Sequence, residues 1–73
     1  MSLKTKTRKN IRLLLRIQEQ AEDFDTHIDE LLARNRDIPH LKFWMGAYRK
    51  ATIFQNTELA DSAMQKVKQL LKV

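Results

Sequence analysis

The chain has 73 residues and a mass of 8.7 kDa, a size typical of one small domain. Its single glycine and single proline argue against a turn-rich β-sandwich or barrel, and its lack of cysteine excludes a disulfide scaffold, a thiolate zinc site and a cysteine nucleophile. The net charge of +5 favours anionic partners: nucleic acid, an anionic membrane surface or an acidic protein.

The first predicted helix is long. Apolar residues recur at helical spacing throughout the chain, which predicts an all-α protein. One apolar stripe, with spacings of 3 and 4 residues, predicts a first helix from about residue 7 to residue 35. Its members are Leu14, Ile17, Ala21, Phe24, Ile28 and Leu31, and Asn35 falls next on the same stripe. Such a helix would span about 43 Å.

The second predicted helix runs from about residue 39 to residue 55. Pro39 disfavours a helical Ile38 and suits the first turn of a new helix, with Asp37 or Ile38 as the cap. Apolar residues cover more than half of this helix, which indicates a central, buried position. Its aromatic residues are predicted to lie in the core: Phe43, Trp44, Tyr48 and Phe54. The alternative is a stacking platform for single strands, because Lys42, Arg49 and Lys50 lie beside them.

The third predicted helix covers about residues 57–71, with a cap signal at Asn56 and Thr57. Short linkers make consecutive helices antiparallel, so the prediction is a three-helix antiparallel bundle forming one domain, residues 1–73. The first helix is longer than either of the other two, so part of its apolar stripe would be exposed to solvent in a monomer. We therefore expect a homodimer, with an interface at Phe24, Ile28, Leu31 and Trp44. The alternative is a monomer whose first helix is bent or interrupted near Asp23–Asp25 and covers its own core.

Charge is distributed unevenly along the first predicted helix. Six cations and no acid precede Glu19: Lys4, Lys6, Arg8, Lys9, Arg12 and Arg16. Such a set can bind the phosphates of nucleic acid or an acidic partner, and together with Ile11 and Leu15 it also suits a membrane surface. A plain solvated terminus is the other interpretation. Lys42, Arg49 and Lys50 form a possible second basic strip.

Few residues suggest catalysis or metal binding. Asp23, His27 and Glu30 share one side of the first helix, but that side lies opposite the apolar stripe, where carboxylates are solvated. His40 is expected to be a cap or surface residue. Gly46 is the only glycine, which leaves no phosphate-binding loop and no nucleophile elbow. We therefore predict no catalytic residue, metal, cofactor or small-molecule substrate, and no enzymatic activity.

The sequence thus predicts a small helical binding or regulatory protein that engages nucleic acid or an acidic partner through its basic N-terminal helix. The alternative is a protein-only adaptor, inhibitor, or immunity- or antitoxin-like bundle. Strictly apolar runs reach only three residues, as at Leu13–Leu15, so no transmembrane segment is expected. Without an export signal or cysteine, we expect a cytoplasmic location.

Overall fold

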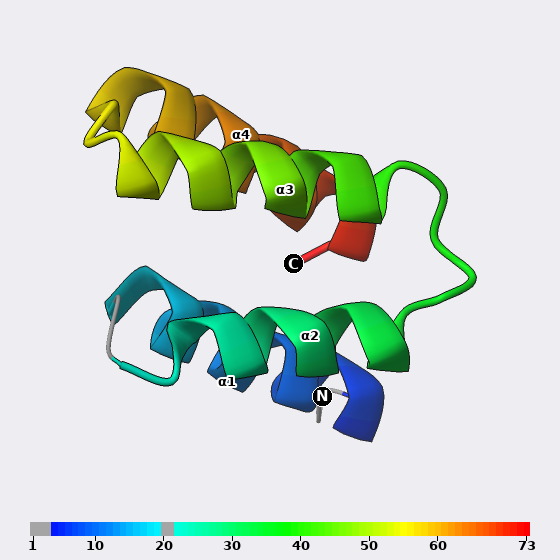
Figure 1. Ribbon diagram of the computed structural model, residues 1–73. Helices are drawn as coiled ribbons and strands as arrows, with labels where there is room; N and C mark the ends of the chain where they lie inside the picture. Colours follow the sequence, from blue (N-terminus) through cyan, green and yellow to red (C-terminus); the bar gives the residue numbers. More distant parts are fainter. Residues whose placement is uncertain (1–3, 20–21) are drawn as a thin grey trace. The chain divides into compact units, whose positions relative to one another are not determined.

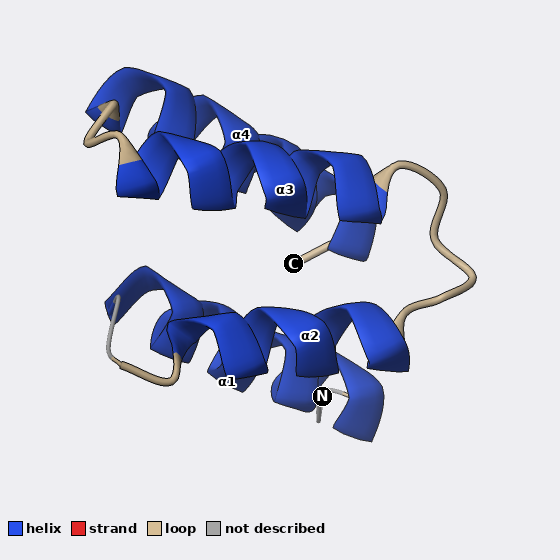
Figure 2. Ribbon diagram, in the orientation of Figure 1, coloured by secondary structure: helices blue, strands red, loops and turns tan. Residues whose placement is uncertain are grey.

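The computed structural model describes residues 4–19 and 22–73, and all regular secondary structure within them is α-helical, which confirms the predicted class (Figures 1 and 2). The helices are α1 (Thr5–Glu19), α2 (Phe24–Arg34), α3 (Leu41–Ile53) and α4 (Thr57–Leu71). They form two compact units, one ending at Arg36 and one covering Asp37–Lys72. In each unit, two consecutive helices pack side by side as a hairpin.

The prediction of one long first helix, and with it the count of three helices, is wrong. The segment is two helices, because α1 ends at Glu19 and α2 begins at Phe24. Glu22 and Asp23 lie in the turn between them. Aspartate is a poor residue inside a helix and a good one at a helix start, where Asp25 also favours the dipole of α2. Ala21, a member of the predicted stripe, lies outside the described residues.

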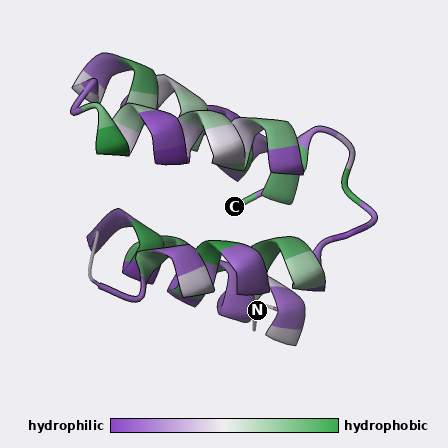
Figure 3. Ribbon diagram, viewed as in Figure 1, coloured by the Kyte–Doolittle hydropathy of each residue, from purple (hydrophilic) through white to green (hydrophobic). Residues whose placement is uncertain are grey.

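Packing of α2 against α1 buries apolar residues in the first unit. The turn between them places the two halves of the apolar stripe on two helices that pack against each other, so Leu14, Ile17, Ile28 and Leu31 are buried without a partner chain, while Phe24 is half-buried. The buried residues of α1 are Asn10, Leu13, Leu14 and Ile17, and those of α2 are Ile28 and Leu31. Each helix carries both hydrophobic and hydrophilic residues (Figure 3), as expected for amphipathic helices that pack in pairs.

The second unit matches its predicted boundaries closely. The predicted helix of residues 39–55 is α3, which starts two residues later and ends two residues earlier, and α4 begins and ends where it was predicted. Leu41, Met45, Tyr48 and Ala51 are the buried residues of α3. Neither Asp37 nor Ile38 is the residue before α3. That residue is His40, which was expected to be a cap or surface residue; it is exposed, and its φ of 67° lies in the left-handed region.

The turn between α3 and α4 ends one helix and starts the next within three residues. The Gln55 N–H donates to the Thr52 carbonyl (3.1 Å) and the Asn56 N–H donates to the Ala51 carbonyl (2.8 Å). This pair of bonds, with Gln55 at a φ of 57°, is the Schellman ending of a helix. The Asn56 side chain then accepts from the Leu59 N–H (3.2 Å) and caps α4, which confirms the cap signal.

The aromatic residues of α3 do not all belong to the core. Tyr48 is buried and Trp44 is half-buried, but Phe43 is 66% exposed and Phe54 is 79% exposed. The prediction of a core position is therefore wrong for Phe43 and Phe54. Within its unit, α4 packs on one side of α3, whereas the sequence pattern suggested burial on more than half of its circumference.

The part of the chain that the structure describes contains no candidate membrane-spanning helix. None of its helices has both the length and the apolar character that crossing a bilayer requires.

Candidate anion-binding site

The six predicted basic residues lie on α1 or immediately before it, and every one of them is exposed. They are Lys4, Lys6, Arg8, Lys9, Arg12 and Arg16. The first turn of α1 contains no acidic residue. Cations at a helix start oppose the helix dipole and repel one another, so a bound anion would relieve both effects.

The hairpin brings a further cation, Arg34, to this cluster. Because α2 runs back along α1, its last turn lies beside the first turns of α1. On one continuous helix, Arg34 would lie about 38 Å from Lys9 at 1.5 Å per residue. Sequence reasoning missed Arg34 for this reason, although the Glu22–Asp23 pair was a signal for a helix start within the stripe.

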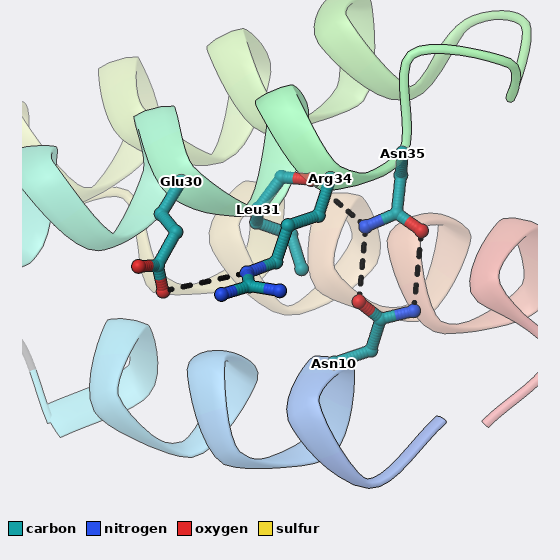
Figure 4. A network of polar contacts seen from close by, with 5 residues as sticks. All are labelled: Asn10, Glu30, Leu31, Arg34 and Asn35. Carbon is teal, nitrogen blue, oxygen red and sulfur yellow. Dashed lines mark hydrogen bonds and ion pairs between the residues drawn. The ribbon is translucent and has the colours of Figure 1, made fainter. Parts of the chain in front are cut away.

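A buried amide pair fixes the two helix ends against each other (Figure 4). Asn10 Nδ2 donates to Asn35 Oδ1 (3.2 Å), and Asn35 Nδ2 donates to Asn10 Oδ1 (2.9 Å). Asn35 Nδ2 also donates to the Leu31 carbonyl (2.8 Å). Asn10 and Asn35 are only 4% and 1% exposed, so the position of Arg34 relative to α1 is set by a buried contact in which each side-chain N and O atom has a hydrogen-bond partner.

Next to this pair lies a hollow of about 420 Å³ that both helices line. Its lining residues are Thr5, Lys6, Lys9, Asn10 and Arg34. A smaller hollow of about 170 Å³ shares Thr5 and Lys9 with it and is completed by Arg8 and Arg12. We refer to the larger one as the basic hollow.

The basic hollow has the chemistry of an oxyanion site. Lysine ammonium groups act as point charges for phosphate, the Arg34 guanidinium offers a planar fork of donors, and the Thr5 hydroxyl can donate a further hydrogen bond. Arg34 Nε lies 3.9 Å from Glu30 Oε2, and the two side chains are 42% and 49% exposed. A contact this long and exposed contributes little stability, so the Arg34 guanidinium can turn to an incoming anion.

Acidic residues collect at the other end of the hairpin. Glu19 ends α1, Glu22 and Asp23 form the turn, and Asp25 lies in the first turn of α2. The hairpin is therefore polarised, with cations where the chain enters α1 and leaves α2, and anions at its turn. Sequence analysis predicted the two charge runs, but their separation to opposite ends of one hairpin follows from the fold.

The predicted constellation Asp23, His27 and Glu30 is only partly assembled. His27 Nε2 contacts Asp23 Oδ2 at 2.9 Å, whereas Glu30 faces Arg34. Across residues 4–19 and 22–73, no group of three or more His, Asp or Glu side chains is arranged to hold a metal ion.

The remaining predicted site residues fall into two groups. Lys42, Arg49 and Lys50 are exposed on α3. Of the four predicted interface residues, Ile28 and Leu31 are buried, while Phe24 and Trp44 are half-buried.

Comparison with known proteins identifies no relative: no family model, curated protein or solved structure matches the chain.

Proposed function

We propose that the chain is a non-enzymatic nucleic-acid-binding protein that contacts the phosphate backbone with the basic end of its α1/α2 hairpin. One observation carries the proposal: Lys6 and Lys9 of α1 and Arg34 of α2 line the same hollow. Residues far apart in the sequence are thus held together by a buried polar pair, in an arrangement suited to a phosphate group.

The exposed side of α1 extends this contact beyond a single phosphate. Lys9, Arg12 and Arg16 follow one another by about 4.5 Å and 6 Å along the helix axis. Within the described part of the chain, none of the three forms an ion pair. A row of unpaired cations suits a backbone of repeated phosphates better than one carboxylate of an acidic protein.

The test is the salt dependence of binding. Fluorescence anisotropy with a labelled DNA duplex, from about 50 to 200 mM salt, gives the slope of log K against log salt. The double variant Lys9→Gln/Arg34→Gln removes two charges from the basic hollow. If both contact phosphates, the slope becomes shallower by roughly 1.8, since each phosphate contact contributes about 0.9.

The matched control is Lys68→Gln/Lys72→Gln, which removes the same charge from α4. It is expected to leave most of the slope intact, and circular dichroism verifies that both variants fold. Equal losses in the two variants would show that net charge alone drives binding. No binding at about 50 mM salt and micromolar protein would refute the proposal and favour the adaptor or inhibitor alternative.

Homodimerisation stays a prediction. Its main argument was the uncovered stripe of a long helix, and that helix is two packed helices. Ile28 and Leu31 are buried without a second copy. Sedimentation equilibrium decides the matter: twice 8.7 kDa confirms a dimer, and 8.7 kDa refutes it.

A further inference from the structure

The outer side of α3 carries a stripe of three exposed residues and one half-buried residue, Gly46, that the core does not use. Phe43, Gly46, Lys50 and Ile53 recur at spacings of 3, 4 and 3 residues, which places them on one face of the helix. Phe43 and Ile53 are 66% and 64% exposed. The buried residues of α3 lie on the opposite side of the helix.

The Trp44 ring contacts the Phe43 ring and orients it. The two rings meet edge to face, with centroids 5.1 Å apart and an interplanar angle of 89°. Lys66 of α4 places its Nζ 6.0 Å from the Trp44 ring centroid. The half-buried indole is thus fixed between α3 and α4, and it orients a phenyl ring that remains largely open to solvent.

Gly46 lies one turn beyond Phe43 on the same face, in the middle of α3. Glycine is a poor residue inside a helix, and a structural reason for it would be a neighbour that a Cβ would touch. Among residues 4–19 and 22–73, no such neighbour lies within 4 Å. The packing of this unit therefore does not require glycine, whereas a ligand lying close against the helix backbone would.

The charge of this face is of one sign. The α3 helix contains Lys42, Arg49 and Lys50 and no acidic residue. Lys42 precedes Phe43, and Lys50 lies two turns beyond it, about 10 Å along the axis. Lys50 thus shares the face with Phe43, and Lys42 lies on its flank about 100° around the helix.

We propose that this face binds single-stranded nucleic acid: a base stacks on Phe43, the strand passes over Gly46, and its phosphates meet Lys42 and Lys50. The inference rests on the proposed function and adds a preference for unpaired bases, because only these offer a ring face for stacking. A membrane surface fits less well, because Lys50 interrupts the apolar residues of the face between Phe43 and Ile53.

The first test is Gly46→Ala, which should raise the stability of the protein and lower its affinity for a single strand. A helix-favouring residue with no steric conflict should raise the Tm by roughly 3–6 °C. The added methyl group stands where the strand passes, so the Kd for an oligo-dT of about ten nucleotides should rise several-fold. A more stable variant with unchanged oligo-dT affinity would contradict the passage of the strand over Gly46.

The second test is Phe43→Ala, for which stacking predicts a loss of oligo-dT affinity of roughly 5- to 150-fold. Phe43→Tyr keeps the ring and should restore binding, whereas Phe43→Leu should not. Leu59→Ala removes an apolar side chain that is 44% exposed on α4, and as the matched control it should leave the Kd within about twofold.

Trp44 provides a local signal, because it is the only tryptophan and its ring lies 5.1 Å from Phe43. Oligo-dT is expected to quench its fluorescence, and inorganic tripolyphosphate, which has no base to stack, is not. Equal quenching by both would contradict stacking at this face.

Two further measurements separate this inference from the proposed function. Lys9→Gln/Arg34→Gln should weaken duplex binding more than oligo-dT binding, because the strand's phosphates meet Lys42 and Lys50, whereas Phe43→Ala should weaken only the single strand. If duplex and strand both bind and Phe43→Ala changes neither, the inference fails and the proposed function stands. If neither binds, both fail. If Phe43→Ala reduces binding to anionic phospholipid vesicles and not to oligo-dT, the face is a membrane contact and the inference is overturned.

Discussion

Asn10 and Asn35 exchange two side-chain hydrogen bonds across the α1/α2 hairpin, at 3.2 Å and 2.9 Å, from positions 25 residues apart in the sequence. Each amide is both donor and acceptor to the other, and both are buried. Any other register of the two helices would leave two amides dry and unpaired. The pair therefore specifies the register of the hairpin, and with it the position of Arg34 at the basic hollow.

Replacing one member of this pair should lower the free energy of unfolding more than replacing both with leucine. Asn35→Ala leaves the Asn10 amide buried without its partner and should lower the free energy of unfolding by about 1–3 kcal/mol. The double variant Asn10→Leu/Asn35→Leu replaces the pair with apolar contact and should be close to neutral. Urea unfolding measures both.

A double-mutant cycle with Asn10→Ala and Asn35→Ala isolates the pair itself. Contacting residues in one hydrogen-bond network couple by about 0.5–3 kcal/mol. A coupling free energy near zero would show that the two amides do not interact in solution.

Thr52 carries a polar atom in an unfavourable environment. Its Oγ1 is buried and has no hydrogen-bond partner within the described residues. Thr52→Val keeps the branched shape and removes the unpaired hydroxyl, so it should raise the free energy of unfolding by about 1 kcal/mol. Thr26→Val, at an exposed position of α2, is the control and should change it by less than about 0.5 kcal/mol.

Gln55 occupies a left-handed position where glycine is usual. Its φ is 57°, and the strain of a side chain there is about 1 kcal/mol. Gln55→Gly should therefore raise the thermal midpoint. The conformational entropy that glycine adds to the unfolded chain reduces this gain. The same substitution at Gln65, exposed within α4, should lower stability by about 1 kcal/mol. Two changes of the same sign would contradict the strain argument.

Trp44 should contribute less to stability than a fully buried tryptophan. Truncating a buried tryptophan to alanine costs about 3–5 kcal/mol. Because Trp44 is half-buried, we expect Trp44→Ala to lower the free energy of unfolding by about 2 kcal/mol. Trp44→Phe keeps an aromatic ring beside Phe43 and should cost less. Denaturation followed by far-ultraviolet circular dichroism checks both, and a near-neutral Trp44→Ala would place the indole at the surface.

Much of this architecture can be predicted from local sequence. The all-α class follows from the 3.6-residue period, and the approximate extent of α4 follows from the cap at Asn56 and an unbroken apolar face. The interruption at Ile38–Pro39 follows from the restriction that proline places on the preceding residue. The six exposed cations before Glu19 are likewise a property of composition and order.

The sequence of the first unit has a mirror arrangement that indicates the hairpin. The buried positions Asn10, Leu14 and Ile17 mirror Asn35, Leu31 and Ile28 at equal distances from the boundary between Glu22 and Asp23. A heptad stripe is compatible with one long helix or with two halves folded on each other, because helical spacing is the same in both. Glu22 and Asp23 favour the folded form, since acidic residues stabilise a helix start.

Only the tertiary structure decides between those two forms, because the choice depends on what covers the stripe. Packing α2 on α1 buries Leu14, Ile17, Ile28 and Leu31 of the stripe within one chain, pairs Asn10 with Asn35 and brings Arg34 to the cations of α1. In the same way, the number of helices packed on α3 determines that Phe43 and Phe54 are exposed. Periodicity reports which residues share a helix face, and burial of that face requires a second surface that the pattern of one helix cannot specify.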